Sequence, residues 1–92
     1  MRVSFLERFR SQCRAADPRD QAAILRLVVD LETTLASPQA HRGVGLRKLH
    51  PAGIWEIRAG LQLRVLFRLG EDEAIFVFLG THDAVKRFLT SL

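Results

Sequence analysis

The spacing of apolar residues changes near Ser37-Pro38, and this change constrains the fold more than any other feature of the sequence. Before this point apolar residues recur at intervals of three and four, which is typical of one face of an amphipathic helix. After it they mostly alternate with polar residues, as they do in β-strands. The helical part must end before Pro38, because a proline disfavours the helical conformation of the residue that precedes it. The sequence therefore predicts an α+β protein in which helices precede a sheet.

Two helices are predicted before Pro38. The first begins in Ser4-Phe5-Leu6-Glu7, where Ser4 and Glu7 have the spacing of a capping box. A short strand at Arg2-Val3 is compatible with the sequence but is not required by it. The second helix begins at Asp17-Pro18, with an N-cap residue followed by proline at the first helical position. Because the connection is so short, the two helices should form an antiparallel hairpin.

Three strands are predicted after Pro38, and short glycine-containing turns separate them. They lie around Ile54–Arg58, Leu63–Leu69 and Ala74–Gly80. Such short turns make neighbouring strands antiparallel. Leu46–Leu49 is either a fourth, lead-in strand or an extended segment, and His82–Leu92 has the spacing of a short C-terminal helix. We expect the helical hairpin to pack on this antiparallel sheet of three or four strands.

The alternation along the strands predicts which side chains share a face. One face of the middle strand is apolar and the other is largely polar. The first carries Leu63, Val65, Phe67 and Leu69, and the second carries Gln62, Arg64, Leu66 and Arg68. A three-residue loop centred on Gly60 would set Glu56 directly across from Arg64. The last strand is apolar on both faces, which predicts that it is fully buried.

Composition limits the classes of protein that fit. The 92 residues suit a single domain spanning 1–92. The one cysteine, Cys13, cannot form an internal disulfide, which favours a reducing compartment such as the cytoplasm. No apolar run approaches the roughly 18 residues that span a membrane. The net charge of +4 suits a polyanionic partner, although it is also compatible with a simple solubilising surface.

The predicted meander brings Arg58, Arg64 and His82 to one edge of the sheet, with Lys48 and Glu56 on the same polar side. Cleavage of RNA by its own 2′-hydroxyl needs a base, an acid and cations that stabilise the charge on the phosphorane. Histidine exchanges protons near neutral pH, and arginine holds phosphate oxygens in a bidentate manner.

Structural roles are equally compatible with these residues. Arg64 and Glu56 can form a cross-strand ion pair, and His82 can lie in the cap of the last helix, which Thr81 or Asp83 can also provide. Neither His41 nor His50 has metal-ligand spacing to the other or to His82, which argues against a metal site.

Four motifs together resemble the RelE/ParE-type toxins through their order and spacing. They are Gly45–Leu49, Gly53–Arg58, Leu63–Arg68 and Gly80–Asp83. The last of these is similar to the branch of YafQ-type ribonucleases, and the resemblance covers nearly the whole chain. It implies an antiparallel sheet packed against a helical hairpin, and a small antitoxin as partner. It also implies one of two activities: cleavage of messenger RNA on the ribosome, or inhibition of DNA gyrase.

The resemblance also implies roles for single residues. Arg64 matches an arginine that contacts phosphate, and His82 matches a catalytic basic residue after the last strand. Glu56 and Arg58 stand where RelE-like nucleases carry paired lysines, so this sequence departs from the pattern at Glu56. The chain has no tyrosine, so the C-terminal tyrosine of several members is missing, and Phe88, the nearest aromatic residue, cannot do acid chemistry.

We therefore expect a toxin of a type II toxin-antitoxin system that acts as a ribosome-dependent endoribonuclease in the cytoplasm, without a metal or other cofactor. The expected catalytic residues are Arg64, His82 and Glu56. The expected phosphate-binding residues are Lys48, Arg58, Arg47 and Lys86. The expected partners are a cognate antitoxin, in a hetero-oligomer, and messenger RNA on the ribosome, with no membrane. Two alternatives stay open: a gyrase inhibitor without catalytic residues, and a degenerate member that only binds its antitoxin.

Overall fold

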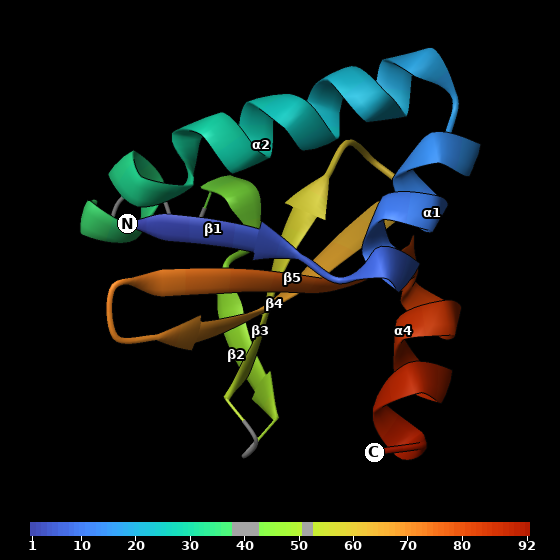
Figure 1. The fold of residues 1–92 in the computed structure, drawn as a ribbon. Helices are drawn as coiled ribbons and strands as arrows, with labels where there is room; N and C mark the ends of the chain where they lie inside the picture. The colour runs from blue at the N-terminus through green and yellow to red at the C-terminus, as the bar shows by residue number, and fades with distance from the viewer. Residues whose placement is uncertain (38–42, 51–52) are drawn as a thin grey trace.

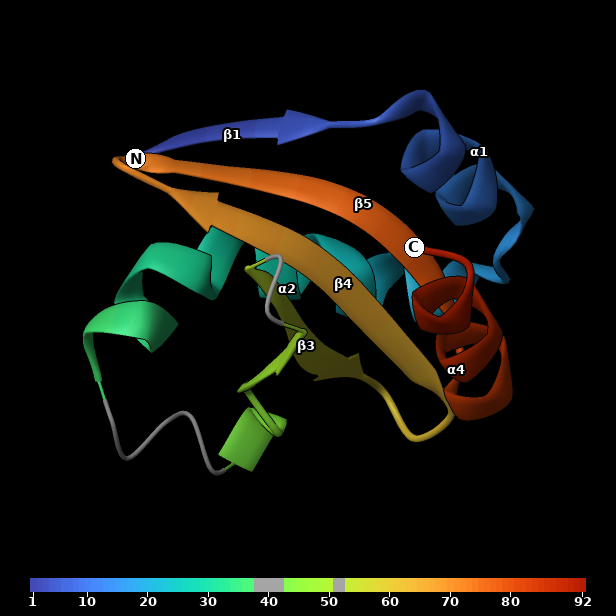
Figure 2. The same ribbon diagram turned by 90° about the horizontal axis from the view of Figure 1, so that it is seen from below.

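The computed structural model describes residues 1–37, 43–50 and 53–92. The order is β1 (Arg2–Phe5), α1 (Glu7–Ala15), α2 (Pro18–Ala36), β2 (Arg47–His50), β3 (Ile54–Ala59), β4 (Leu63–Gly70), β5 (Glu73–Thr81) and α4 (His82–Thr90). The strands form one sheet in the order β1-β5-β4-β3-β2 (Figures 1 and 2). The α+β class, the helical hairpin and the C-terminal helix are therefore as predicted.

The two edge strands are the parts of the sheet that the sequence left open. β1 pairs in parallel with β5, with Ser4 across from Ile75, and the segment after Gly45 forms a strand, β2, antiparallel to β3. β3 to β5 are antiparallel as predicted. The predicted capping box is wrong: α1 begins at Glu7, and its N-cap Leu6 makes no side-chain hydrogen bond. Ser4 lies inside the strand instead, and the backbone N–H of Leu6 donates to the carbonyl oxygen of Phe76 at 3.0 Å. Sheet pairing thus outweighs the local cap.

The start of α2 follows the local signals of the sequence. The backbone N–H of Asp20 donates to Oδ1 of Asp17 at 3.0 Å, and Pro18 occupies the first helical position. This bond satisfies one of the N–H groups that a helix leaves without a partner at its N-terminus. Ile24 and Leu31 are the buried residues of α2, and they pack onto the sheet. The hairpin is thereby fixed to one face of the sheet.

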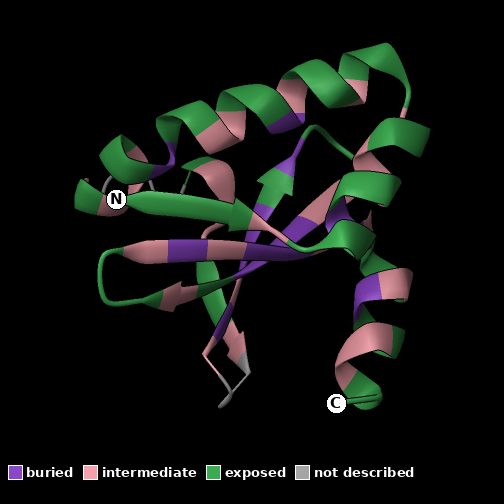
Figure 3. Ribbon diagram, in the orientation of Figure 1, coloured by how far each residue is buried: buried purple, intermediate pink, exposed green. Residues whose placement is uncertain are grey.

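The core has two parts, one on each face of the sheet. On the α1 and α2 side, the larger part includes four phenylalanine rings with centroids 5.4–5.9 Å apart. These are Phe5, Phe9, Phe67 and Phe76. The smaller part lies between the sheet and α4 and contains the buried residues Ile54, Leu66, Val77 and Val85. β5 contributes buried residues to both parts, as its two-sided apolar sequence predicts (Figure 3).

The β3–β4 register differs from the prediction by two residues. The three-residue loop is 60–62 and is not centred on Gly60, so Arg58 lies across from Arg64, and Glu56 lies across from Leu66. Gly60 has a φ of +70°, a conformation that favours glycine, and it takes the first loop position. Because a shift of two residues preserves the faces of a strand, the predicted apolar and polar faces are unchanged.

The β2–β3 register corrects the predicted position of Lys48. Arg47 lies across from Glu56, and Lys48 lies across from Trp55, which packs on the α1 and α2 side. Side chains of successive strand residues point to opposite faces, so Lys48 does not share the face of Glu56. Arg47 takes that place.

Candidate functional site

A buried carboxylate lies at the centre of the polar face of β3. Glu56 is 3% exposed and is the one buried charged residue in the described part of the chain. Its Oε1 accepts a hydrogen bond from Nε of Arg47 at 3.2 Å and lies 3.9 Å from Nε of Arg64. A carboxylate is costly to bury unless cations or hydrogen-bond donors compensate for the lost water. Glu56 is therefore the shared counterion of two guanidinium groups.

Arg64 and Arg58 are neighbours across the β3–β4 ladder. Nη1 of Arg64 donates to the carbonyl oxygen of Leu63 at 3.3 Å, and Nη2 of Arg58 donates to the carbonyl oxygen of Gly43 at 3.4 Å. The Arg58 side chain passes close to Gly45, where an added Cβ would lie 2.6 Å from Nε of Arg58. Gly45 also has a φ of +66°, a conformation that favours glycine, and a larger residue there would displace the Arg58 side chain.

These side chains line a cavity of about 320 Å³. Its residues are Gly45, Arg47, Glu56, Arg58 and Arg64. Three guanidinium groups face one carboxylate, so the lining is positively charged. Guanidinium groups bind phosphate through pairs of parallel hydrogen bonds, which makes this cavity a suitable phosphate site.

His82 lies at the end of the sheet where β4 begins. Gly80 is across from Arg64 and Thr81 is across from Leu63, and α4 begins at the next residue. Oγ1 of Thr81 accepts from the backbone N–H of Ala84 at 3.3 Å, so Thr81 is the N-cap. His82 is therefore not the capping residue, and its side chain is exposed.

The structure brings together four of the seven site residues predicted from the sequence, namely Arg47, Glu56, Arg58 and Arg64. His82 and Lys86 lie one turn apart on α4, beyond the strand end that carries Arg64, and no hydrogen bond or ion pair in the described residues joins His82 to Arg64 or Glu56. Lys48 is on the other face. Sequence reasoning missed Gly45, although a glycine just before a predicted strand was a usable signal.

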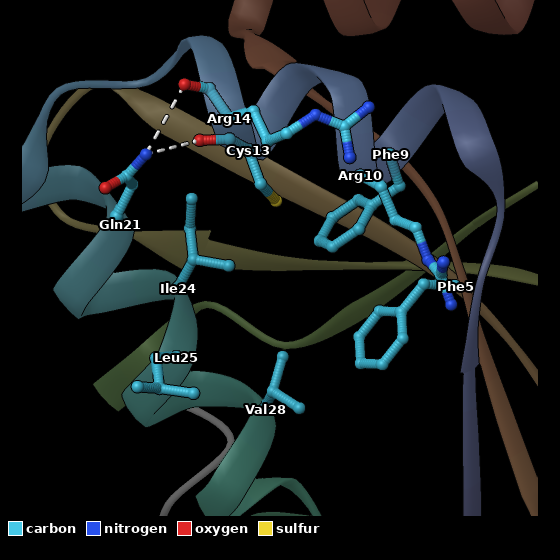
Figure 4. A pocket seen from close by; sticks show the side chains of 9 residues that line it. All are labelled: Phe5, Phe9, Arg10, Cys13, Arg14, Gln21, Ile24, Leu25 and Val28. Atoms are coloured by element: carbon cyan, nitrogen blue, oxygen red, sulfur yellow. Dashed lines mark hydrogen bonds between the residues drawn. The ribbon is translucent and has the colours of Figure 1, made fainter.

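A separate apolar groove of about 360 Å³ lies between β1, α1 and α2 (Figure 4). Phe5, Phe9 and Ile24 line it, and Arg10 and Arg14 also contribute to its lining. Nε2 of Gln21 donates to the carbonyl oxygen of Cys13 at 3.0 Å, which joins the two helices at one end of the groove (Figure 4). Leu25 also lines the groove, and this residue is 65% exposed.

Within residues 1–37, 43–50 and 53–92, no group of three His, Cys, Asp or Glu side chains is arranged to hold a metal ion. His41 lies outside these residues. No helix in the same ranges is both long and apolar enough to cross a membrane.

The arrangement of strands and helices matches that of solved toxins. The YoeB/ParE toxin from Agrobacterium tumefaciens superposes with a TM-score of 0.70 at 17% identity, over 89% of this chain and 99% of that one. This chain has the RelE/ParE toxin fold. RelE of the archaeal RelE-RelB complex from Pyrococcus horikoshii OT3 gives a TM-score of 0.67 at 14% identity, over 87% and 92% of the two chains. The Escherichia coli DinJ-YafQ toxin-antitoxin complex gives 0.62 at 17% identity, over 90% and 93%.

At the level of sequence, no protein-family model matches the chain, and no curated protein matches it. The similarity to RelE/ParE-type toxins is therefore a similarity of fold. The chemistry must be argued from the residues of the site.

Proposed function

We propose that this chain is the toxin of a toxin-antitoxin pair and that it cleaves messenger RNA on the ribosome, using side chains in place of a metal ion. The observation that carries the proposal is the cavity in which the buried Glu56 is flanked by the guanidinium groups of Arg47 and Arg64. The fold shared with YoeB/ParE, RelE and YafQ toxins supports it.

In this mechanism the arginine side chains stabilise negative charge. Nε of Arg64 and Nε of Arg47 face the carboxylate of Glu56, so terminal nitrogens remain for the non-bridging phosphate oxygens. Their positive charge offsets the charge that develops on the phosphorane, and Arg58 and Lys86 bind flanking phosphates. The cations of every step are side chains, so we propose a reaction that needs neither a metal nor another cofactor.

His82 is the proposed proton-transfer residue. The 2′-oxygen attacks the adjacent phosphorus and loses its proton to a base, the bond from phosphorus to the 5′-oxygen breaks, and the leaving oxygen takes a proton from an acid. The products are a 2′,3′-cyclic phosphate and a 5′-hydroxyl. An imidazole exchanges protons near neutral pH and suits either transfer. We assign Glu56 a positioning role, because its carboxylate is buried against two guanidinium groups.

The proposed protein partner is an acidic antitoxin, bound in the cytoplasm. Solved structures with this fold include a RelE-RelB complex and a DinJ-YafQ toxin-antitoxin complex. The apolar groove between β1, α1 and α2, with Arg10 and Arg14 in its lining, would accept apolar side chains flanked by acidic ones. The net charge of +4 favours such a partner at longer range.

Induced expression tests the proposal in cells. Wild-type protein should stop growth and translation, and Arg64→Ala and His82→Ala should each remove this effect, because the loss of one charge-stabilising or proton-transfer group costs about 100- to 1000-fold in rate. Arg68→Ala is the matched control, since Arg68 is an exposed arginine on the same face of β4. If translation continues and supercoiling by gyrase is blocked, the protein is a gyrase inhibitor and not a nuclease. Full toxicity of both variants would also contradict the proposal.

A further inference from the structure

A third cavity, a groove of about 440 Å³, lies between α2 and β3. Much of its lining is apolar, and charged side chains from α2 and β3 complete it. The apolar part comprises Ala22, Ala23, Leu27, Val44, Ile57 and Ala59. The charged part comprises Arg19, Arg26, Arg58 and Asp30, so three guanidinium groups face one carboxylate.

Arg58 lines both this groove and the cavity around Glu56, which we call the catalytic cavity. β2 pairs with residues 54–56 of β3 and not with the rest of that strand. The outer edge of β3 is therefore not covered by a paired strand at Arg58, whose side chain reaches the carbonyl oxygen of Gly43. The two cavities are thus connected around the edge of the sheet through one guanidinium group.

The two arginines of α2 are available to a ligand. Arg19 and Arg26 are exposed, and no ion pair or hydrogen bond within the described part of the chain involves their side chains. They are seven residues apart, which places them two turns apart on one face of the helix. Asp30, one turn beyond Arg26, is the one acidic side chain in the lining and marks the end of the positive stretch.

We propose that this groove binds the ribose-phosphate backbone of the same RNA strand whose scissile phosphate occupies the catalytic cavity. The inference rests on the proposed function and extends it from one phosphate to a path along the strand. Arg58 holds the phosphate where the strand passes the sheet edge, and Arg19 and Arg26 hold the following phosphates. The apolar lining accepts ribose and base faces, and guanidinium planes stack on bases.

The test measures how the binding of single-stranded RNA depends on length and salt. The probes are a trinucleotide and an oligonucleotide of roughly twelve nucleotides, both made with 2′-deoxy sugars at the position of cleavage so that they stay intact. The variant is Arg19→Ala/Arg26→Ala. Its matched control is Arg2→Ala/Arg68→Ala, which removes the same charge from β1 and β4 at exposed residues that do not line the groove.

We expect the long oligonucleotide to bind wild-type protein more tightly than the trinucleotide does. The groove variant should lose this advantage, and the slope of log affinity against log salt should fall by about 1.4, because each contact with a single strand contributes about 0.7. Trinucleotide binding and the control variant should be unchanged. Equal losses in the two double variants would mean that only net charge matters, and an unchanged groove variant would make the arginines a solvated helix face. Both results overturn the inference.

Two further measurements separate this inference from binding of ribosomal RNA and from the proposed nuclease activity. If the groove variant binds the long oligonucleotide normally but loses affinity for ribosomes without message, the ligand is ribosomal RNA, and the inference is wrong. Cleavage of a translated message by wild-type protein tests the proposed function independently. Cleavage without any effect of the groove variant overturns only the inference, and groove-dependent binding without cleavage overturns only the nuclease.

Discussion

At the scale of single residues, the site depends on the carboxylate of Glu56, which is buried between Arg47 and Arg64. Glu56→Gln keeps the size of the side chain and removes its charge, so the two guanidinium groups lose their shared counterion and should shift. We expect slower cleavage and a loss of about 1 kcal/mol in the free energy of unfolding, since Arg47 is largely exposed. The pH profile of the remaining activity distinguishes a positioning role of Glu56 from a role as general base. An unchanged profile supports positioning, whereas loss of its acidic limb would make Glu56 the general base.

Cys13 offers a second residue-scale prediction, because burial raises the pKa of its thiol. Less thiolate is then present in the folded protein than in the unfolded chain at the same pH. As the pH rises above the pKa of the unfolded thiol, ionisation favours the unfolded chain, and the folded state loses stability until its own pKa is passed. Alkylation of Cys13 at pH 8 should be slower than that of a free thiol, and denaturant should accelerate it. Equal rates in folded and denatured protein would contradict this account.

At the scale of elements, the position of α4 depends on the lack of a side chain at Gly80. An added Cβ would lie 2.8 Å from Cε2 of Phe78 and 3.0 Å from Cβ of Ala84, so Gly80→Ala requires the Phe78 ring and Ala84 of α4 to shift. We expect a loss of stability of about 1–3 kcal/mol and faster hydrogen exchange in α4. Cleavage should fall because His82 begins that helix. Gly70→Ala is the control, since nothing lies within 4 Å of its added Cβ, and equal effects of the two substitutions would refute this role of Gly80.

The elements with local signals were those that the sequence predicted well. Asp17 and Pro18 fix the start of α2 through short-range capping, and alternation correctly assigned the faces of β3 and β4. β1 has no such signal, because it is four residues long and its partner β5 is about seventy residues away in the chain. Because Ser4 takes part in this pairing, it is not the predicted N-cap of α1.

The site was predictable in composition but not in arrangement. A strand shifted by two residues keeps its faces. Alternation therefore cannot decide whether Arg64 lies across from Glu56, as predicted, or across from Arg58, as observed. Arg47, and not the predicted Lys48, lies beside Glu56 for a related reason. The register between β2 and β3 is set by tertiary packing, including that of Trp55. Local sequence therefore identifies the charged residues of the site but not their partners.

At the scale of the whole molecule, the apolar groove and the basic charge should together select an acidic partner. Leu25→Asp places a negative charge in the lining of the groove at a residue that is 65% exposed, so the fold should tolerate it. We expect weaker binding of the cognate antitoxin, measured by calorimetry, with unchanged cleavage. Leu61→Asp is the control, because Leu61 is 93% exposed in the β3–β4 loop. Equal binding of the antitoxin by the two variants would show that the groove is not part of the interface.

The most direct test of the central claim is the chemistry of the RNA ends made on a translated message. Pre-formed ribosome complexes are mixed with the protein after magnesium is chelated, and cleavage is mapped by primer extension. We expect products with a 5′-hydroxyl and a 2′,3′-cyclic phosphate, no cleavage where the 2′-hydroxyl is replaced by hydrogen, and about 100- to 1000-fold slower cleavage by Arg64→Ala and His82→Ala. Cleavage of the 2′-deoxy position, a strict requirement for magnesium in the chemical step, or full activity of both variants would contradict the account.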